Sequence, residues 1–227
     1  DFRNNVIYNW GFNSAYGGEL WPRNWISNYY KYGPATSKNV RDRIFLQKDP
    51  RGKMYADGNY VWGFPEISKD NWSGGIDFAP DGEATEQTLR ARKPYVVAPV
   101  TTHSAEDAFE RVLSHAGCSL VRDVVDRRII EEIRTGTATH GETYGGGGKG
   151  IINSQDAVGG WPELKSSEPP TDTDHDGMSD VWEEKMGFNL NDPADGPADP
   201  DGDGFTNLED YLNSLVGNVY SGHPLSE

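Results

Sequence analysis

The sequence predicts a mainly β chain built as a solenoid of stacked coils, followed by two short helices and an acidic C-terminal module. Three observations lead to this fold class. Strand-like runs recur in the first part of the chain, the hydrophobic period changes from strand to helix near residue 104, and a run of carboxylates begins at residue 172. At 227 residues the chain is long enough for more than one domain. We expect three parts: 1–103, 104–162 and 163–227.

The predicted coils rest on runs at residues 5–11, 28–33 and 59–63. Each run begins with an asparagine, continues with β-branched or aromatic residues and ends with a glycine, and the asparagines are 23 and 31 residues apart. These separations suit one coil of a solenoid with loop insertions. Stacked coils place equivalent side chains above one another, so the asparagines can hydrogen-bond along the stack. A β sandwich with Asn/Gly turns is the alternative.

Residues 64–82 carry several Pro and Gly residues and predict a long surface loop, in which Asn71 begins an N-glycosylation sequon.

Two amphipathic helices should follow this part of the chain. Ser104 is the expected N-cap of the first, which stops at Gly117, and the second runs from Val121 to Gly136. We expect the pair to pack on the solenoid as a cap over its open end, and a cover over its side is the alternative. Cys118, the only cysteine, is expected to be a buried thiol without a disulfide partner.

The C-terminal module contains two twelve-residue loops of one pattern, residues 172–183 and 199–210. Each has oxygen-bearing side chains at positions 1, 3, 5 and 9, a glycine at position 6 and an acid at position 12, which is the pattern of a calcium-binding loop. Position 7 of such loops supplies a backbone carbonyl. The predicted Ca²⁺ ligands are Asp172, Asp174, Asp176, Met178, Asp180 and Glu183 in loop one, and Asp199, Asp201, Asp203, Phe205, Asn207 and Asp210 in loop two.

Each loop should continue into a short helix, at residues 179–187 with Val181 and Trp182 facing inward, and at residues 207–216. The connection 189–197 is expected to run over the surface. The glycine-rich run 145–148 has no Lys-Ser/Thr pair after it and is expected to be a flexible loop rather than a phosphate loop. Residues 217–227 are expected to form a loose tail.

Charge is concentrated in the calcium module. The chain has 36 acidic and 21 basic residues, a net charge of −15, and residues 171–210 hold 13 of the acids and one of the bases. Bound cations would neutralise this segment, whereas its carboxylates alone would repel one another. The absence of a basic stripe argues against a nucleic-acid partner, and no apolar run is long enough to span a membrane.

Several segments together resemble the C-terminal half of pectate lyases of polysaccharide lyase family 1. They are residues 1–11 (DFRNNVIYNWG), 28–36 (NYYKYGPAT), 150–162 (GIINSQDAVGGWP) and the calcium tail. The resemblance covers nearly the whole chain. It implies a right-handed parallel β-helix and a secreted protein. It also implies calcium-dependent β-elimination of polygalacturonate, an acidic polysaccharide.

The resemblance implies a catalytic Arg-x-Pro-Arg segment and aspartates that hold the substrate calcium, all of them before the first asparagine run. No Arg-x-Pro-Arg occurs in this chain; Trp21-Pro22-Arg23 is a look-alike. We therefore assign no catalytic residue and expect the catalytic arginine upstream, in an N-terminal portion that would be a partner of this chain. Arg3 and Lys31, beside the first two runs, are candidates for binding substrate carboxylates, against a structural role for each.

Two other functions stay open. The tail also resembles dockerin-type loops, which have Asp at position 12 as Asp210 does, so the chain could be a non-catalytic calcium-dependent structural or carbohydrate-binding module. A different solenoid enzyme acting on another acidic glycan is the third possibility. A second acidic cluster outside residues 172–210 would favour a chain that is itself the enzyme.

Overall fold

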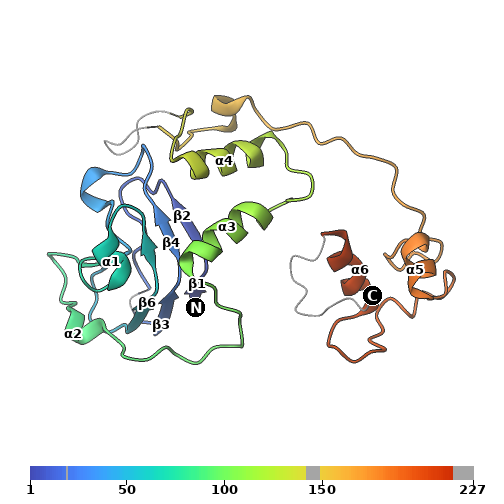
Figure 1. Ribbon diagram of the computed structural model, residues 1–227, viewed down its shortest axis with the longest axis horizontal. Helices are drawn as coiled ribbons and strands as arrows, with labels where there is room; N and C mark the ends of the chain where they lie inside the picture. Colours follow the sequence, from blue (N-terminus) through green and yellow to red (C-terminus); the bar gives the residue numbers. More distant parts are fainter. Residues whose placement is uncertain (19, 142–148, 217–227) are drawn as a thin grey trace. The chain divides into compact units, whose positions relative to one another are not determined.

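The computed structural model describes residues 1–18, 20–141 and 149–216, and it divides into two compact units, Asp1–Pro162 and Glu163–Glu227. Figure 1 shows the elements in chain order. The strands are β1 (Phe2–Arg3), β2 (Val6–Tyr8), β3 (Arg23–Ile26), β4 (Tyr29–Lys31), β5 (Phe45–Gln47), β6 (Met54–Asp57), β7 (Tyr60–Val61) and β8 (Ile76–Phe78). The helices are α1 (Pro65–Lys69), α2 (Glu86–Leu89), α3 (Ala105–His115), α4 (Val124–Thr135), α5 (Asp180–Met186) and α6 (Asn207–Leu215), with 3-10 turns η1 (Lys38–Val40) and η2 (Gln155–Val158).

All strand pairs in the described part of the chain are parallel, and they form three sheets of order β1-β3-β6, β2-β4-β7 and β5-β8. The chain visits the sheets in the same order each time. In the second sheet Val6 lies beside Tyr29 and Tyr29 beside Tyr60, so the register follows the asparagine spacing in the sequence. The prediction of a mainly β chain with strands at these three runs is confirmed. A β sandwich pairs its strands antiparallel and does not fit.

The corner between the first and second sheets is a two-residue turn. Asn4, Ser27 and Gly58 occupy its first position with φ of 56°, 50° and 66°. Glycine adopts this left-handed backbone without strain, and asparagine tolerates it better than most residues. The second position is always an asparagine: Asn5, Asn28 or Asn59.

These asparagines form a hydrogen-bonded ladder. The side-chain amide of Asn5 donates to Oδ1 of Asn28 at 2.9 Å, and that of Asn28 donates to Oδ1 of Asn59 at 2.8 Å. The backbone N–H groups of Asn5 and Asn28 donate to the same oxygens. Asn59 continues the ladder to Asn71, at 2.8 Å. The predicted bonding of asparagines along the stack is confirmed, because each amide carries both a donor and an acceptor.

The three sheets share one apolar core. Tyr30 and Val61 from the second sheet, Met54 from the first and Phe45 and Ile76 from the third all belong to one buried cluster. Side chains alternate across each strand. The alternate residues of the second sheet therefore face away from this core. They are Val6, Tyr29 and Tyr60, which form one row across β2, β4 and β7.

Helices α3 and α4 cover that outward row. Phe109 of α3 lies over Tyr29 with ring centroids 4.3 Å apart, and Leu113 is buried in the same cluster. Ile130 and Ile133 of α4 pack against it. The two predicted helices are thus present, and of the two expected positions they take the side: they cover the face of the sheet and not the end of the stack. The apolar row on β2, β4 and β7 is the surface that needs covering.

Three further predictions for this unit are wrong. The expected loop 64–82 contains α1 and β8, and its Asn71 is buried in the ladder, so the sequon is not on the surface. The second helix begins after an Asp123 N-cap, which leaves Val121 outside it and 83% exposed. Cys118 is exposed, because the helix connection lies away from the apolar row.

The predictions for residues 145–148 and 217–227 lie outside the described residues. Within the described ranges, none of the helices combines the length and the apolar character needed to cross a membrane.

The ladder gives a direct stability test. Asn28 is fully buried, and replacing it with alanine leaves two donors of Asn5 without their acceptor and removes one of the two donors to Oδ1 of Asn59. Asn28→Ala should lower the free energy of unfolding by about 3 kcal/mol, measured by chemical denaturation. Asn153→Ala, at an exposed asparagine of the same unit, is the control and should change it by less than about 0.5 kcal/mol. Equal stability of the two variants would contradict a structural role for the ladder.

Candidate metal centre and surface hollow

The two loops of the second unit have the same hydrogen bonds at positions 1, 3 and 5. In loop one, Asp172 accepts N–H bonds from His175 and Gly177, and Asp176 accepts one from Met178 at 2.8 Å. In loop two, the equivalent bonds join Asp199 to Gly202 and Gly204, and Asp203 to Phe205 at 2.8 Å. Each loop is therefore wound around its own carboxylates, as a calcium loop must be.

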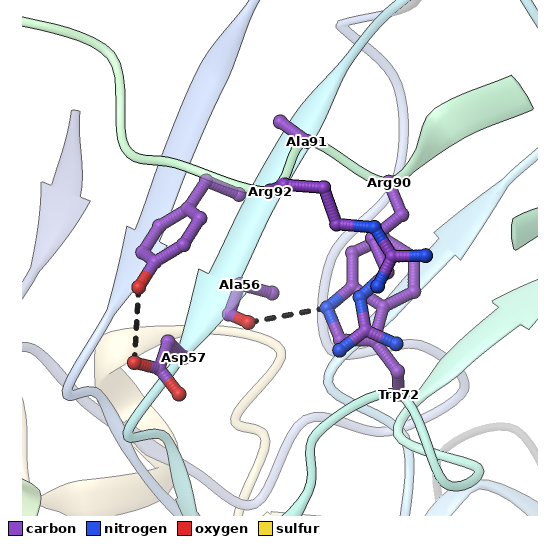
Figure 2. Close-up of a pocket in the computed structure, with 7 residues that line it drawn as sticks. Ala56, Asp57, Trp72, Arg90, Ala91 and Arg92 are labelled. Carbon is purple, nitrogen blue, oxygen red and sulfur yellow. Dashed lines mark hydrogen bonds between the residues drawn. The ribbon is translucent and has the colours of Figure 1, made fainter. Parts of the chain in front are cut away.

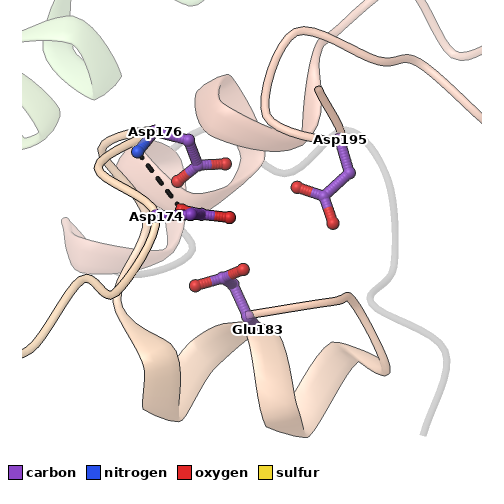
Figure 3. Close-up of side chains that lie close together, drawn as sticks. All are labelled: Asp174, Asp176, Glu183 and Asp195. Atoms are coloured by element: carbon purple, nitrogen blue, oxygen red, sulfur yellow. Dashed lines mark hydrogen bonds between the residues drawn. The ribbon is translucent and has the colours of Figure 1, made fainter. Parts of the chain in front are cut away.

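Four carboxylates converge beside loop one, and Figure 3 shows them pointing toward a common centre. They are Asp174, Asp176, Glu183 and Asp195, with one oxygen of each within 4.8 Å of the others. Asp199, Asp201 and Asp203 form the equivalent group in loop two at the same separation, but all three are exposed.

The group in loop one lacks the donors that buried carboxylates need. Glu183 is 0% exposed, and neither of its oxygens has a hydrogen-bond partner among the described residues. Asp174 Oδ2, Asp176 Oδ2 and Asp195 Oδ1 are also buried and unpartnered. Burial, and then the charges of Asp174 and Asp176, raise the pKa of Glu183 to about 7. An oxygen-seeking cation such as Ca²⁺ would satisfy all of these atoms.

The predicted ligands of loop one do not all reach this centre. Asp174, Asp176 and Glu183 do. Asp180 instead accepts bonds from the backbone N–H and the hydroxyl of Thr173, both at 2.8 Å. Met178, predicted to offer its backbone carbonyl, has a fully buried side chain.

In loop two, the pKa of Asp210 is raised, first by burial and then by the charge of Asp203 nearby. The Asn207 side-chain amide donates to the backbone carbonyl of Asp195 at 2.8 Å, and the Phe205 side chain is about half exposed. The sequence did not predict Asp195 as part of a site, because it belongs to the connection expected on the surface. Its neighbour Gly196 is in fact buried.

Helices α5 and α6 pack against each other behind the loops. Trp182 meets Tyr211 with ring centroids 5.4 Å apart, and Tyr211 is buried. The expected inward position of Val181 is wrong, since it is 77% exposed. A seven-residue helix presents too narrow an apolar face to bury both neighbours.

The two predicted substrate-binding residues of the first unit are both engaged within the protein. Arg3 pairs with Asp1 at 2.7 Å and donates to the Thr102 hydroxyl. Lys31 is buried, and its ammonium donates to the Arg134 carbonyl near the C-terminal end of α4 at 2.8 Å. Burial lowers the pKa of Lys31. Lys31 therefore holds α4 against β4 and presents little charge to solvent.

A hollow of about 250 Å³ lies over the outer side of β6 (Figure 2). It is lined by Tyr55, Ala56, Asp57, Trp72, Arg90, Ala91 and Arg92. Arg90 lies over the Trp72 ring at 5.1 Å, and Arg92 is exposed. Guanidinium groups beside aromatic rings suit a carboxylated ligand. The sequence did not predict this site, because strand β6, the loop with Trp72 and the segment after α2 meet only in the fold.

Curated proteins with similar sequences provide independent information. The Aspergillus flavus protein named probable pectate lyase C is 33% identical over 225 residues, which covers 97% of this chain and 49% of that protein. This chain is similar to proteins named probable pectate lyase C. The Aspergillus oryzae protein of that name is 32% identical with the same coverage, and that of Emericella nidulans is 30% identical, with 97% and 48% covered.

The chain spans about half the length of the curated relatives it matches. No protein-family model matches it. The relatives thus support a pectate lyase-like sequence across both units of the structure, since the matched share reaches almost from end to end.

Removing the charge of Glu183 should have opposite effects on the melting temperature without metal and on the stabilisation by Ca²⁺. Glu183→Gln removes one of the repelling charges, so it should raise the melting temperature of the chain in EDTA. The same change should reduce the rise in melting temperature that Ca²⁺ produces, because the site loses a charged ligand. Glu184→Gln, at the exposed neighbour, should leave both values nearly unchanged. A Glu183 variant that behaves like the Glu184 variant would rule out a cation at this centre.

Proposed function

We propose that this chain is part of a pectate lyase-like enzyme that degrades pectate by calcium-dependent β-elimination. The observation that carries the proposal is the similarity to probable pectate lyases C over 97% of the chain. The parallel sheets and the asparagine ladder support it, because they suit the fold that the resemblance implies. The substrate would be an acidic polysaccharide, and the protein would be secreted.

The fold proposed for residues 1–103 is a right-handed parallel β-helix. Each passage of the chain through the three sheets would be one coil, with β3, β4 and β5 in one and β6, β7 and β8 in the next. The shared core of the three sheets and the parallel register support this proposal. Residues 104–162 would pack on the side of the β-helix, and residues 163–227 would form the calcium module.

Each loop of the calcium module would hold one Ca²⁺. Support comes from the buried carboxylate oxygens beside loop one and from the matching hydrogen bonds in loop two. Both loops supply most of their ligands from their own side chains and leave little coordination for a substrate. We therefore give these ions a structural role.

The chemistry would be removal of the C5 proton of a galacturonate residue and cleavage of its 4-O-glycosidic bond, which leaves an unsaturated uronate. In the resembling family an arginine takes the proton, which requires a substrate made more acidic, since a free guanidinium holds its own proton tightly. We place that arginine in protein outside these 227 residues.

The proposal that the catalytic arginine lies outside this chain has a direct test. The 227-residue chain alone, given polygalacturonate and Ca²⁺, should produce no rise in the ultraviolet absorbance of unsaturated uronates. A longer protein that includes an Arg-x-Pro-Arg segment before residue 1 should produce the rise, and EDTA should abolish it. Turnover by the chain alone would overturn the placement of the base, and an inactive longer protein would overturn the lyase proposal.

The second candidate is a non-catalytic carbohydrate-binding module, which the hollow over β6 favours. Arg90 already pairs with Glu86 at 2.6 Å, so the exposed Arg92 guanidinium and the Tyr55 ring would hold a galacturonate there without any catalytic base. Arg92→Ala should then weaken binding of oligogalacturonate to the chain by about tenfold, measured by calorimetry. Arg111→Ala, at another exposed arginine, should not weaken it. Binding that both variants retain would exclude the hollow as the binding site.

A further inference from the structure

Position nine of loop one does not supply a ligand in this structure. Both carboxylate oxygens of Asp180 are occupied by Thr173, one by its backbone N–H and one by its hydroxyl, each at 2.8 Å. Asp180 also begins α5, where a carboxylate is favoured by the helix N-terminus. Its local bonds thus hold both of its oxygens, and Asp180 is not one of the four residues whose oxygens converge at the centre.

Asp195 supplies an oxygen there instead. Its Oδ2 accepts the backbone N–H of Asn189 at 3.1 Å, which fixes the carboxylate. Its Oδ1 is buried and has no partner among the described residues, and one oxygen of the carboxylate lies within 4.8 Å of oxygens from Asp174, Asp176 and Glu183. Figure 3 shows Asp195 reaching the group from a segment separate from loop one.

The burial of Glu183 supports a ligand at this centre, and the packing of Gly196 shows how closely the connection approaches it. Glu183 is fully buried, aimed at the same centre, and both its oxygens lack partners in the described part of the chain. The segment with Asp195 also approaches loop one too closely for a side chain at the next residue. A Cβ on Gly196 would lie 2.6 Å from Oδ2 of Asp176. Glycine is therefore required for this approach.

We propose that Asp195, from the connection between the two loops, is a ligand of the first calcium site in place of Asp180. This inference rests on the proposed calcium site. The site would be discontinuous in sequence, with three ligands from loop one and one from the connection. The connection would then bind metal, whereas the sequence predicted only a surface segment there.

The ligand from the connection links the first site to the second loop. The Asp195 carbonyl accepts the Asn207 side chain, and the Ala198 carbonyl accepts the Asn207 N–H at 2.9 Å. The Gly196 carbonyl accepts the N–H of Leu208 at 3.0 Å. Metal at the first site would therefore order the start of α6, which closes loop two. The two sites should bind Ca²⁺ with positive cooperativity.

The test is calorimetric titration of Ca²⁺ into the chelator-treated 227-residue chain and three isosteric variants. Asp195→Asn keeps only one side-chain oxygen, so it loses either the metal bond or the bond from Asn189, together with a charge. It should weaken one calcium site by at least about tenfold. Asp180→Asn and Asp192→Asn remove the same charge from the same unit, and each should change the affinities by less than about threefold.

Gly196→Ala keeps Asp195 but forces its segment and the Asp176 carboxylate apart, and it should weaken the same site. Circular dichroism in EDTA checks that the variants start from a comparable fold. Equal affinities of Asp195→Asn and Asp192→Asn would overturn the proposal, and so would an equal loss with Asp180→Asn. A parent chain that binds no Ca²⁺ would instead overturn the calcium site on which the inference rests.

Discussion

The hydrogen bonds between stacked asparagine amides determine how the first unit is built. A corner that places Asn5, Asn28 and Asn59 above one another buries several backbone and side-chain donors. Each amide binds one neighbour through its oxygen and the next through its nitrogen, and the second N–H of Asn28 and Asn59 donates to the backbone carbonyl of Phe2 or Trp25. The row also fixes the register of β2, β4 and β7, and hence which side chains face the core and which face α3.

The second unit also buries polar atoms that need partners, but its carboxylates cannot provide those partners for one another. Carboxylates only accept hydrogen bonds, so a group of them has no internal donor to share. Glu183 and its neighbours are buried without partners in the described residues, and their charges repel. A cation supplies the missing positive charge and the missing contacts at once. The asparagine ladder of the first unit therefore needs no metal, whereas the second unit depends on the cations in its solution.

Sequence reasoning succeeded where the pattern is local or repeated. The strands after Asn5, Asn28 and Asn59 and the winding of both acidic loops follow from residues close together in the chain. It failed where a residue joins a pattern from elsewhere. Asn71 enters the ladder only 12 residues after Asn59, because α1 replaces most of a coil. Asp195 is outside both loop motifs, and the hollow over β6 combines three separate segments.

The central claim is that the asparagine ladder of the first unit is stable without metal, whereas the loops of the second unit need metal. Amide hydrogen exchange of the whole chain, with Ca²⁺ and with EDTA, compares the two directly. The backbone amides of Asn28 and Asn59 should be equally protected in both conditions. Those of Asn207 and Leu208, which donate to the connection between the loops, should be protected only with Ca²⁺. Protection of Asn207 and Leu208 in EDTA, or loss of protection at the ladder, would contradict the account.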